Sequence, residues 1–497
     1  MTAARPPMRG AIGTGALAAT RHEDEAAALG ERLAALLAAG ADGTSATLLS
    51  ATVPAGGVDP ISLLAAGQEA DTEVALWLRP SEGTAFVGIG RAWAAEGAGP
   101  ERFHEAEAAW RTVLAGARLD RDDATARGTG PVLVGGLGFT GRVPAADDPW
   151  GPFGPSSLVL PELLLAVTPE GAWLTGSLPG LASAADVRAL ERRWERLASR
   201  ARALAPNPNG MVAMPVFAPL AVTEEQPSHD HWRRLVGMFS GAVGRGRIDK
   251  VVLARRVGLR SPVELDVPNA LRRLAAGAPE STTYAFRRGG RTFLGATPER
   301  LVRTEGRVFR TVAVAGTIRR GADAAEDDRL GRDLLASEKD REEHAIVVDS
   351  IRGLLRPVAD TLTVAPEPGV MTLRFVQHLV TEISGTVPEG NGLLALGERL
   401  HPTPAVGGEP RDVALALVDE HEGFDRGWYA GPVGWLGADG DGELCVALRC
   451  GIVDRTSATL FAGCGIVADS DPDLEWEESR IKLRAVISAL GIPGDEA

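Results

Sequence analysis

The sequence predicts a mixed α and β fold in which helices and strands follow one another along the whole chain. Apolar residues recur at helical spacing in residues 25–40, 103–117 and 185–204, whereas shorter runs between them have the alternation or continuous apolarity of strands. The chain has 497 residues, which is long enough to bury a sizeable core. Length alone allows two or three domains or one large composite domain.

The strands expected in the first half are three short apolar runs, EVALWLR, TAFVGIG and PVLVGGLGF. Prolines and polar residues are then concentrated between residues 205 and 230, and such breakers favour loops. We therefore divide the sequence into an N-terminal half, residues 21–226, and a C-terminal region, residues 227–497. Residues 1–20 are expected to be disordered.

The C-terminal region repeats this mixture with stronger signals. HWRRLVGMFSGAVGRG is typical of a helix that ends at glycine, KVVLARRVGL of a strand, and TYAFRRGGRTFLGATP of a hairpin that turns at Gly289-Gly290. One long amphipathic helix is expected over residues 325–355, because Pro357 stops it.

The end of the chain predicts more strands and one capped helix. GWYAGPVGWLG and ELCVALRCGIVDRTSATLFAGCGIV are typical of strands separated by turns. A last helix is expected over residues 472–490, with Asp471 as its N-cap, Pro472 in its first position and Gly491 past its end.

Charge and cysteine content exclude several classes of protein. The net charge of -14 argues against nucleic acid and anionic membranes as partners, because such binding needs clustered Lys and Arg. Cys445, Cys450 and Cys464 lack C-x-x-C spacing, which disfavours a disulfide framework and a structural zinc site. No apolar run is long enough to span a bilayer. We expect a protein of the reducing cytoplasm.

Lysine is rare: of 52 basic residues only Lys250, Lys339 and Lys482 are lysine. Arginine stays protonated, whereas lysine can lose its proton and act as a base, or serve as a compact donor. Lys339 and Lys482 lie in two carboxylate-rich stretches, SEKDREEH and EWEESRIKL. Functional lysines are one interpretation. The other is that nucleotide bias removed most lysines and three remained by chance.

Two predicted helices carry carboxylates on one face. Glu475, Glu478 and Lys482 lie at i, i+3 and i+7 in the last helix. Asp340 and Glu343 are three residues apart in the long helix. If the two faces meet, their oxygens could hold Mg²⁺, which usually takes one or two protein carboxylates. The alternative is two solvated acidic faces with ordinary ion pairs.

Other polar residues stand where the pattern predicts burial. Lys250 opens an apolar strand, Glu299 follows a turn, and Arg449 ends VALR inside a strand. Glycine-rich turns at residues 315–317 and 463–465 would let backbone N–H groups approach an anion. Each of these could equally be a surface charge or a plain turn.

Nine motifs carry a resemblance to a known family. In order they are KVVLAR, FLGATPERL, VAVAGTIRRG, SEKDREEH, VQHL, HPTPAVGG, WYAGPVGWL, VALRCG and GCGIVADSDPDLEWEESRIK, all within residues 230–490. This order resembles the chorismate-utilising enzymes, and within them the isochorismate synthases. The resemblance implies an α+β fold: two large antiparallel β-sheets packed face to face, helices on the outside, and one composite domain with its site in a cleft between C-terminal elements.

The resemblance also implies an activity and the residues that perform it. The expected reaction is the Mg²⁺-dependent conversion of chorismate to isochorismate by a monomer, with water entering at C2 as the C4 hydroxyl departs. By motif, Lys250 matches the general base and Glu299 the general acid. Glu343 and Glu478 match the metal ligands, with Glu475 supporting through water. The substrate residues implied in the same way are Thr317, His378, Ala405, Tyr429, Arg449, Gly465 and Lys482.

The chemistry read from the residues agrees with these roles. Chorismate is a dianion, so an acidic protein must supply local positive charge, for which Mg²⁺, Arg449 and Lys482 are available. Hydroxide leaves poorly, so Glu299 must hold a proton, which requires burial to raise its pKa. Lys250 must conversely be uncharged to accept a proton, which arginine could not do.

The nucleophile distinguishes the members of this family. HPTPAVGG, residues 401–408, is similar to the isochorismate synthase version, in which a bulkier Val406 keeps ammonia out. The alternatives are a salicylate synthase, which adds pyruvate elimination, an aminating enzyme, and a chorismate-binding protein without activity. The sequence leaves open whether the product would serve menaquinone, siderophores or another dihydroxybenzoate metabolite.

Overall fold

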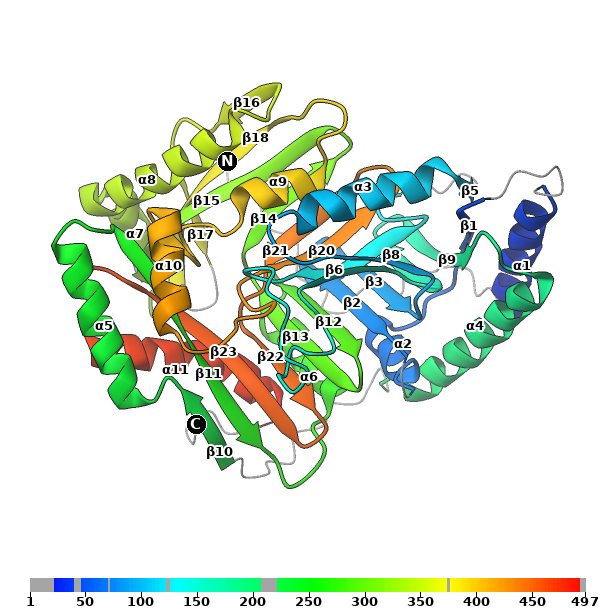
Figure 1. Cartoon of the computed structure of the whole chain (residues 1–497), viewed down its shortest axis with the longest axis horizontal. Coiled ribbons are helices and arrows are strands. Elements are labelled where there is room, and N and C mark those ends of the chain that lie inside the picture. Colours follow the sequence, from blue (N-terminus) through cyan, green and yellow to red (C-terminus); the bar gives the residue numbers. More distant parts are fainter. Residues whose placement is uncertain are drawn as a thin grey trace.

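The computed structural model describes residues 22–39, 46–69, 72–121, 126–206, 221–372 and 376–491. In these residues two large β-sheets share a core between their faces, and helices lie around them (Figure 1). The predicted fold class, α+β with two large, mostly antiparallel sheets in one composite unit, is confirmed. The prediction of disorder for residues 1–20 lies outside the described residues. No helix among the described residues is long and apolar enough to cross a membrane.

The larger sheet contains 13 strands, and every neighbouring pair is antiparallel except β1 with β5. Its strands lie in the order β10 (Ala221–Gln226), β11 (Lys250–Arg260), β23 (Ser457–Ile466), β22 (Cys450–Asp454), β13 (Arg291–Thr297), β12 (Thr282–Arg288), β2 (Val74–Arg79), β3 (Thr84–Ile89), β8 (Leu163–Thr168), β9 (Gly171–Pro179), β1 (Leu48–Pro54) and β5 (Ala117–Asp120), with β19 (Gly408–Glu409) beside β11.

The smaller sheet contains 10 strands, all paired antiparallel. Its order is β16 (Thr361–Val364), β18 (Val376–Thr386), β15 (Val308–Arg319), β14 (Arg300–Glu305), β21 (Gly442–Val446), β20 (Pro432–Gly437), β6 (Val132–Leu137), β7 (Ser156–Leu160) and β4 (Trp93–Glu96), with β17 (Gly369–Thr372) beside β18. Because β2 pairs with β12 and β6 with β20, both sheets contain strands from both halves of the sequence.

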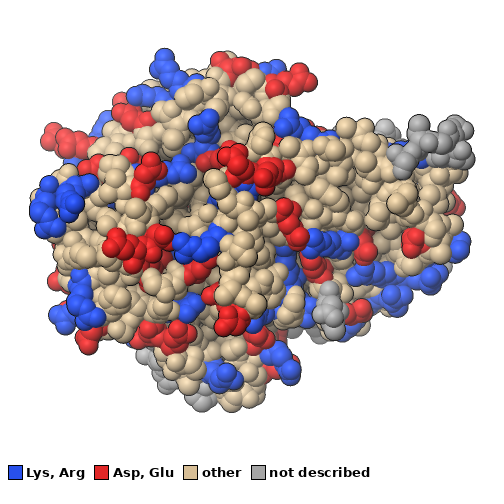
Figure 2. All heavy atoms as spheres, viewed as in Figure 1, with Lys and Arg blue, Asp and Glu red and all other residues tan. Residues whose placement is uncertain are grey.

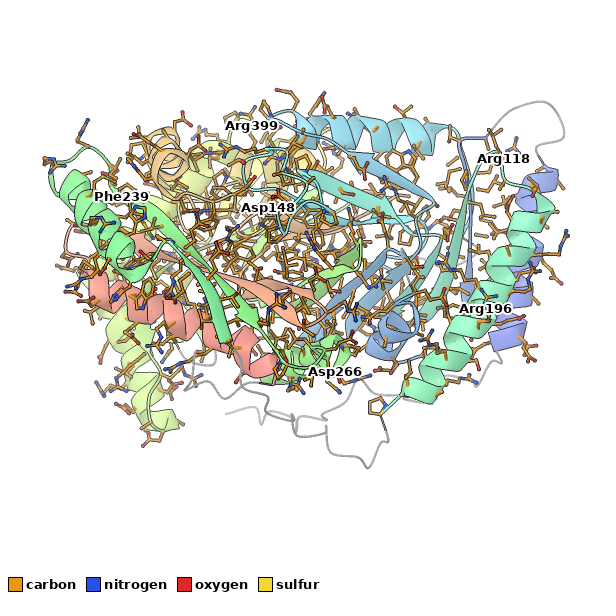
Figure 3. The ribbon with its side chains drawn as sticks, turned by 60° about the horizontal axis from the view of Figure 1, so that its bottom comes forward. Arg118, Asp148, Arg196, Phe239, Asp266 and Arg399 are labelled. Carbon is orange, nitrogen blue, oxygen red and sulfur yellow. The ribbon has the colours of Figure 1, made fainter. Side chains whose placement is uncertain are left out.

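Eleven α-helices and one 3-10 turn, η1 (Pro80–Glu82), complete the described part of the chain. The helices are α1 (His22–Ala38), α2 (Pro60–Ala66), α3 (Arg102–Ala115), α4 (Ala184–Leu204), α5 (His229–Gly244), α6 (Val267–Gly277), α7 (Ala324–Ala336), α8 (Glu338–Leu355), α9 (Leu393–Leu400), α10 (Arg411–His421) and α11 (Pro472–Ala489). In Figure 3, α1 and α4 pack together at one end of the molecule, whereas α5 and α11 pack together at the other.

Successive side chains in the strands of the larger sheet point alternately into two different hydrophobic cores. In β12, Tyr284 and Phe286 enter the core between the sheets, whereas Ala285 enters the core beneath α1, α2, α4, α6 and α11. Phe293 and Leu294 of β13 divide in the same way. Since successive side chains of a strand point to opposite faces, a sheet buried on both sides needs apolar residues at every position. This explains the continuous apolar runs in the sequence.

The single long helix expected over residues 325–355 is wrong. The chain forms α7 and α8 instead, and Ser337 between them is extended, with φ −69° and ψ 111°. Ser337 Oγ accepts a hydrogen bond from Asp340 N at 3.3 Å, so the serine caps a new helix. The last helix agrees with the sequence: Asp471 caps α11 by accepting from two backbone N–H groups.

Both predicted glycine turns are also wrong, because each lies inside a strand. Gly463 and Gly465 belong to β23. Gly316 forms a bulge in β15, where its φ of +74° suits glycine. Arg449, expected inside a strand, occupies the connection between β21 and β22 with φ +49°. Long-range strand pairing decided these positions, and local sequence does not reveal it.

Charges of both signs are interspersed on the face drawn in Figure 2. Among the residues coloured there, blue and red side chains alternate over the surface without one continuous basic area. On this face the acidic residues are thus spread out among basic ones.

Candidate active site

Strand β11 forms the middle of the candidate active site. Its first residue, Lys250, pairs with Glu409 of β19, and the neighbouring strand β23 places Gly465 opposite Val252. A β-carbon on Gly465 would come within 2.4 Å of Lys250 Cε and 3.1 Å of Nζ. A larger residue would therefore collide with the lysine. The sequence predicts only a backbone role for Gly465, and the structure adds that it makes room for Lys250.

Glu299 lies in the connection between β13 and β14, at a position fixed by β21. Its carbonyl accepts from Val446 N at 3.0 Å, and Thr297 Oγ1 donates to Val446 O at 2.6 Å. Burial raises the pKa of the Glu299 carboxyl, although Lys250 and Arg449 oppose the shift. The carboxyl therefore keeps its proton to a higher pH than an exposed glutamate, as a general acid requires.

Arg449 lies near Glu299, in a backbone conformation that is uncommon outside glycine. Its carbonyl accepts from Ala296 N at 3.2 Å, which ties it to the strand leading to Glu299. Burial lowers the pKa of the guanidinium, and nearby Tyr429 and Glu478 counter this shift. A cation that burial disfavours has much to gain from an incoming anion.

Tyr429 and Lys482 meet at Gly463. The Tyr429 ring stacks on Phe461 with centroids 5.4 Å apart, and a β-carbon on Gly463 would lie 2.9 Å from the tyrosine oxygen. Lys482 Nζ donates to Gly463 O at 2.7 Å and pairs with Glu478 Oε1 at 2.7 Å. Gly463 thus leaves space for the Tyr429 hydroxyl and offers its carbonyl to Lys482.

Arg449, Tyr429 and Lys482 border one cavity, and Lys250 and Glu299 are not part of its lining. It is lined by Val252, Ala405, Val406, Tyr429, Ala430, Leu448, Arg449, Phe461, Ala462, Gly463 and Lys482. Four of the predicted substrate residues, Ala405, Tyr429, Arg449 and Lys482, belong to this set. The lining is largely apolar with two cations, which suits a small anion that carries an apolar ring.

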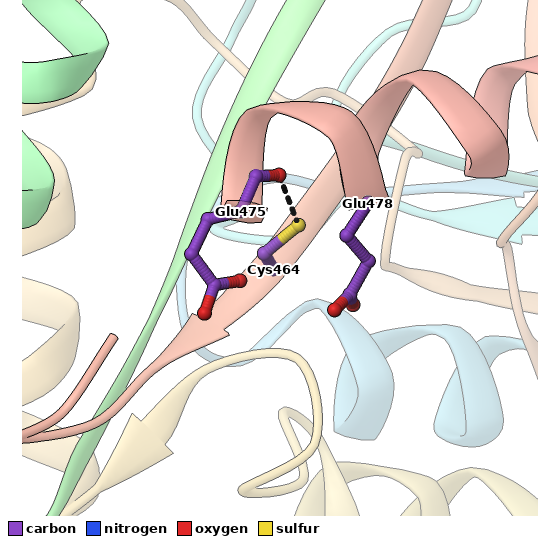
Figure 4. A group of neighbouring side chains, drawn as sticks. All are labelled: Cys464, Glu475 and Glu478. Carbon is purple, nitrogen blue, oxygen red and sulfur yellow. Dashed lines mark hydrogen bonds between the residues drawn. The ribbon is translucent and has the colours of Figure 1, made fainter. Parts of the chain in front are cut away.

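Two of the predicted metal ligands converge next to this cavity. Glu475 and Glu478 of α11 and Cys464 of β23 each offer a ligand atom, all within 4.8 Å of one another (Figure 4). Burial raises the pKa of Glu475, and the charge of Glu478 adds to the shift. Two carboxylates that disfavour each other's charge would gain from a divalent cation between them, so this oxygen pair fits Mg²⁺.

Glu343, the third predicted ligand, does not belong to this cluster. It is exposed on α8. Its neighbour His344 is buried, with Nε2 2.7 Å from Thr381 Oγ1, and this contact fixes the helix against β18. A role for Glu343 at the metal stays a prediction.

Thr317 and His378 meet across β15 and β18. Thr317 Oγ1 lies 2.9 Å from His378 Nδ1, next to the bulge at Gly316. Burial lowers the pKa of His378, and the positive charges of Arg449 and Lys482 lower it further. His378 therefore lies within the electric field of the same two cations that border the cavity, and it stays neutral near pH 7.

Three features were missed in the sequence. The hydroxyl of Thr403 lies beside Glu299 and opposes the rise of its pKa. Cys464 joins the carboxylates, and burial raises the pKa of its thiol to about 12. Glu422 and Arg426 form a buried ion pair beside the cavity. Local sequence gave no signal for that pair, because α10 ends at His421 and both residues lie in the connection that follows it.

Comparisons with known proteins place these residues in a family. The family described as chorismate binding enzymes matches residues 34–491. The chain is 38% identical over 449 residues to the salicylate biosynthesis isochorismate synthase of Pseudomonas aeruginosa, covering 90% of this chain and 91% of that protein. It is 32% identical over 459 residues to the isochorismate synthase MenF of Bacillus subtilis, covering 90% and 94%.

Solved structures show the same architecture. The menaquinone-specific isochorismate synthase MenF from Escherichia coli superposes with a TM-score of 0.74 at 26% identity, covering 93% of this chain and 99% of that one. Anthranilate synthase component I from Streptococcus pneumoniae superposes with a TM-score of 0.63 at 20% identity, covering 84% and 91%. The second match concerns the fold alone.

Proposed function

The chain belongs to the chorismate-binding enzymes, and from this premise we propose that it is a Mg²⁺-dependent isochorismate synthase that converts chorismate to isochorismate. The predicted family and the prediction of an enzyme are confirmed by the relatives, which are isochorismate synthases and hence isomerases. One observation carries the proposal furthest: burial raises the pKa of the Glu299 carboxyl, and the basic side chains of Lys250 and Arg449 lie close enough to oppose that shift.

In the proposed reaction Lys250 and Glu299 move protons at opposite ends of the ring. Lys250 takes a proton from water as the water oxygen forms a bond to C2. The ring double bonds shift, the C4–O bond breaks, and the departing hydroxyl takes the proton of Glu299 and leaves as water. One water is consumed and one released, so substrate and product are isomers. Lys250 ends protonated and Glu299 ionised, and a return proton resets both.

The remaining side chains bind charge. Arg449 and Lys482 would hold one carboxylate of the substrate, and the Tyr429 hydroxyl would donate to it. Glu475 and Glu478 would hold Mg²⁺, which would neutralise the other carboxylate. Because the cavity walls are apolar, these charges act in a medium that screens them less than water does.

Segment 401–408 is proposed to select the nucleophile. Ala405 and Val406 both line the cavity, and Val406 is 4% exposed. A branched side chain at this place narrows the approach to C2 and favours water over ammonia. The other expectations, a monomer in the cytoplasm without nucleic acid or membrane partners, stay predictions. So does the pathway, since one relative is named for salicylate biosynthesis and another as menaquinone-specific.

Product analysis tests the proposed function. The protein is incubated with chorismate and Mg²⁺, and the products are resolved by chromatography. Isochorismate alone is expected. Salicylate with pyruvate would instead indicate a salicylate synthase, an aminated product that needs ammonia would indicate an aminating enzyme, and unchanged chorismate that is nevertheless bound would indicate a protein without activity.

A further inference from the structure

A buried ion pair connects the strand of Lys250 to segment 401–408. Arg426 donates from Nε and Nη2 to the two carboxylate oxygens of Glu422, both at 2.6 Å. The two side chains are 3% and 2% exposed. We propose that this pair positions the wall that selects the nucleophile. The proposal rests on the proposed function for its chemistry and on the following contacts for its geometry.

The guanidinium of Arg426 reaches two separate backbone segments. Nη1 donates to Val406 O at 2.9 Å, and Nη2 donates to Val252 O at 2.7 Å. Glu422 extends the link, because its Oε2 accepts from Ala254 N at 2.9 Å. One planar fork thus joins β11, the residue after α10, and segment 401–408.

The two carbonyl acceptors belong to residues that face the substrate space. Val252 and Val406 both line the cavity, and Lys250 is two residues before Val252 on β11. The distance between the general base and the wall near C2 therefore depends on the distance between these two carbonyls. A rigid guanidinium fixes that distance, whereas an ammonium group offers its three donors from one point.

A second contact keeps the guanidinium in place. The ring of Phe139 lies 4.5 Å from the Arg426 guanidinium carbon. With a carboxylate on one edge, two carbonyls on the other and an aromatic ring over it, Arg426 has a complete set of partners without any substrate. The pair is therefore formed before binding, which is the condition for positioning a wall in advance.

The test compares two lysine substitutions of paired arginines. Arg426→Lys keeps the charge but cannot span both carbonyls. Arg272→Lys is the matched control, because Arg272 makes a bidentate contact to Asp59, at 2.6 and 3.3 Å, with no role in the cavity. A third variant, Glu422→Gln with Arg426→Met, removes both charges and leaves an acceptor for Ala254 N, so that folding does not depend on an unpaired buried carboxylate.

Two readouts separate positioning from general stability. Amide hydrogen exchange of residues 405–408 is expected to accelerate in both Arg426 variants and to stay unchanged in Arg272→Lys. With chorismate, Mg²⁺ and ammonium, kcat for isochorismate is expected to fall about 10- to 100-fold with a small change in KM. The ratio of aminated product to isochorismate is expected to rise about 10-fold.

The exchange measurement and the product ratio test separate parts of the proposal. Unchanged exchange at residues 405–408 in the Arg426 variants would overturn the positioning role, whatever the activity. Accelerated exchange with an unchanged product ratio would show that the pair holds the segment without selecting the nucleophile, which also refutes the proposal. If the unmodified protein makes no isochorismate, the proposed function fails, while the exchange measurement still decides whether the pair holds the segment.

Discussion

The catalytic half of the candidate site and its metal-binding half differ in how completely the structure assembles them. Lys250, Glu299 and Arg449 come from strands and strand connections, and backbone hydrogen bonds hold each of these strands in register. The metal half relies on helices: Glu475 and Glu478 converge on α11, whereas Glu343 is exposed on α8 outside their cluster. Strand pairing positions catalytic groups without a ligand, whereas Glu343, on a separate helix, would need a cation to join the other two carboxylates, because like charges repel.

The largest expected effect tests the strand-borne half. Lys250→Arg keeps a basic side chain but removes the only group at this position that can accept a proton, so kcat should fall about 10⁴-fold. Chorismate binding, measured by calorimetry, should change little. Lys339→Arg on α8 is the matched control and should keep full activity. Substantial turnover by Lys250→Arg would rule out the lysine as the base.

A smaller loss of activity is expected from a substitution at Gly465, which only leaves space for Lys250. Gly465→Ala introduces a β-carbon 2.4 Å from Lys250 Cε, so the lysine must move. We expect kcat to fall about 10- to 100-fold, since displacement by about 1 Å is enough for such a loss. Gly237→Ala on α5 meets no atom within 4 Å and should leave kcat unchanged. Equal activity of the two variants would show that Lys250 has room elsewhere.

The helix-borne half should respond to the metal instead. Glu475→Gln removes one of two carboxylates that disfavour each other's charge, so we expect about 10- to 100-fold more Mg²⁺ to be needed for half-maximal activity. Without Mg²⁺ the variant should melt no lower than the unmodified protein. The substitution removes the cost of burying a charged carboxylate at this position and the repulsion between that charge and Glu478. Thermal melting with and without Mg²⁺ measures this. A lower melting temperature in the absence of Mg²⁺ would contradict it.

Glu343→Gln shows whether the third predicted ligand joins the metal. If α8 contributes when Mg²⁺ binds, this exposed substitution should also raise the Mg²⁺ requirement while leaving the melting temperature without Mg²⁺ unchanged. An unaltered Mg²⁺ requirement would remove Glu343 from the metal site and leave the cluster at Glu475 and Glu478 as the whole protein contribution.

The sequence predicted what depends on local pattern and missed what depends on pairing between distant strands. The capped helix at residues 472–490 was correct because Asp471 and Pro472 signal its start locally. The break at Ser337 could have been predicted, since serine three residues before Asp340 is an N-cap signal. That Gly465 lies against Lys250 could not, because the contact exists only when β23 pairs with β11 in one register. Motif resemblance supplied the site residues, and geometry supplied their neighbours.

The smallest expected effect concerns the pH dependence of stability. Burial raises the pKa of Glu299 above its value in the unfolded chain, so between these two pKa values the folded protein binds more protons than the unfolded one. Its free energy of unfolding must therefore fall as pH rises through that window and stay lower above it. Glu299→Gln cannot ionise. Relative to the unmodified protein it should gain melting temperature as pH rises from 4 to 8, although it loses activity. A constant difference between the two proteins over this range would mean that the carboxyl is not proton-bearing in the fold, and the proposed general acid would have to be sought elsewhere.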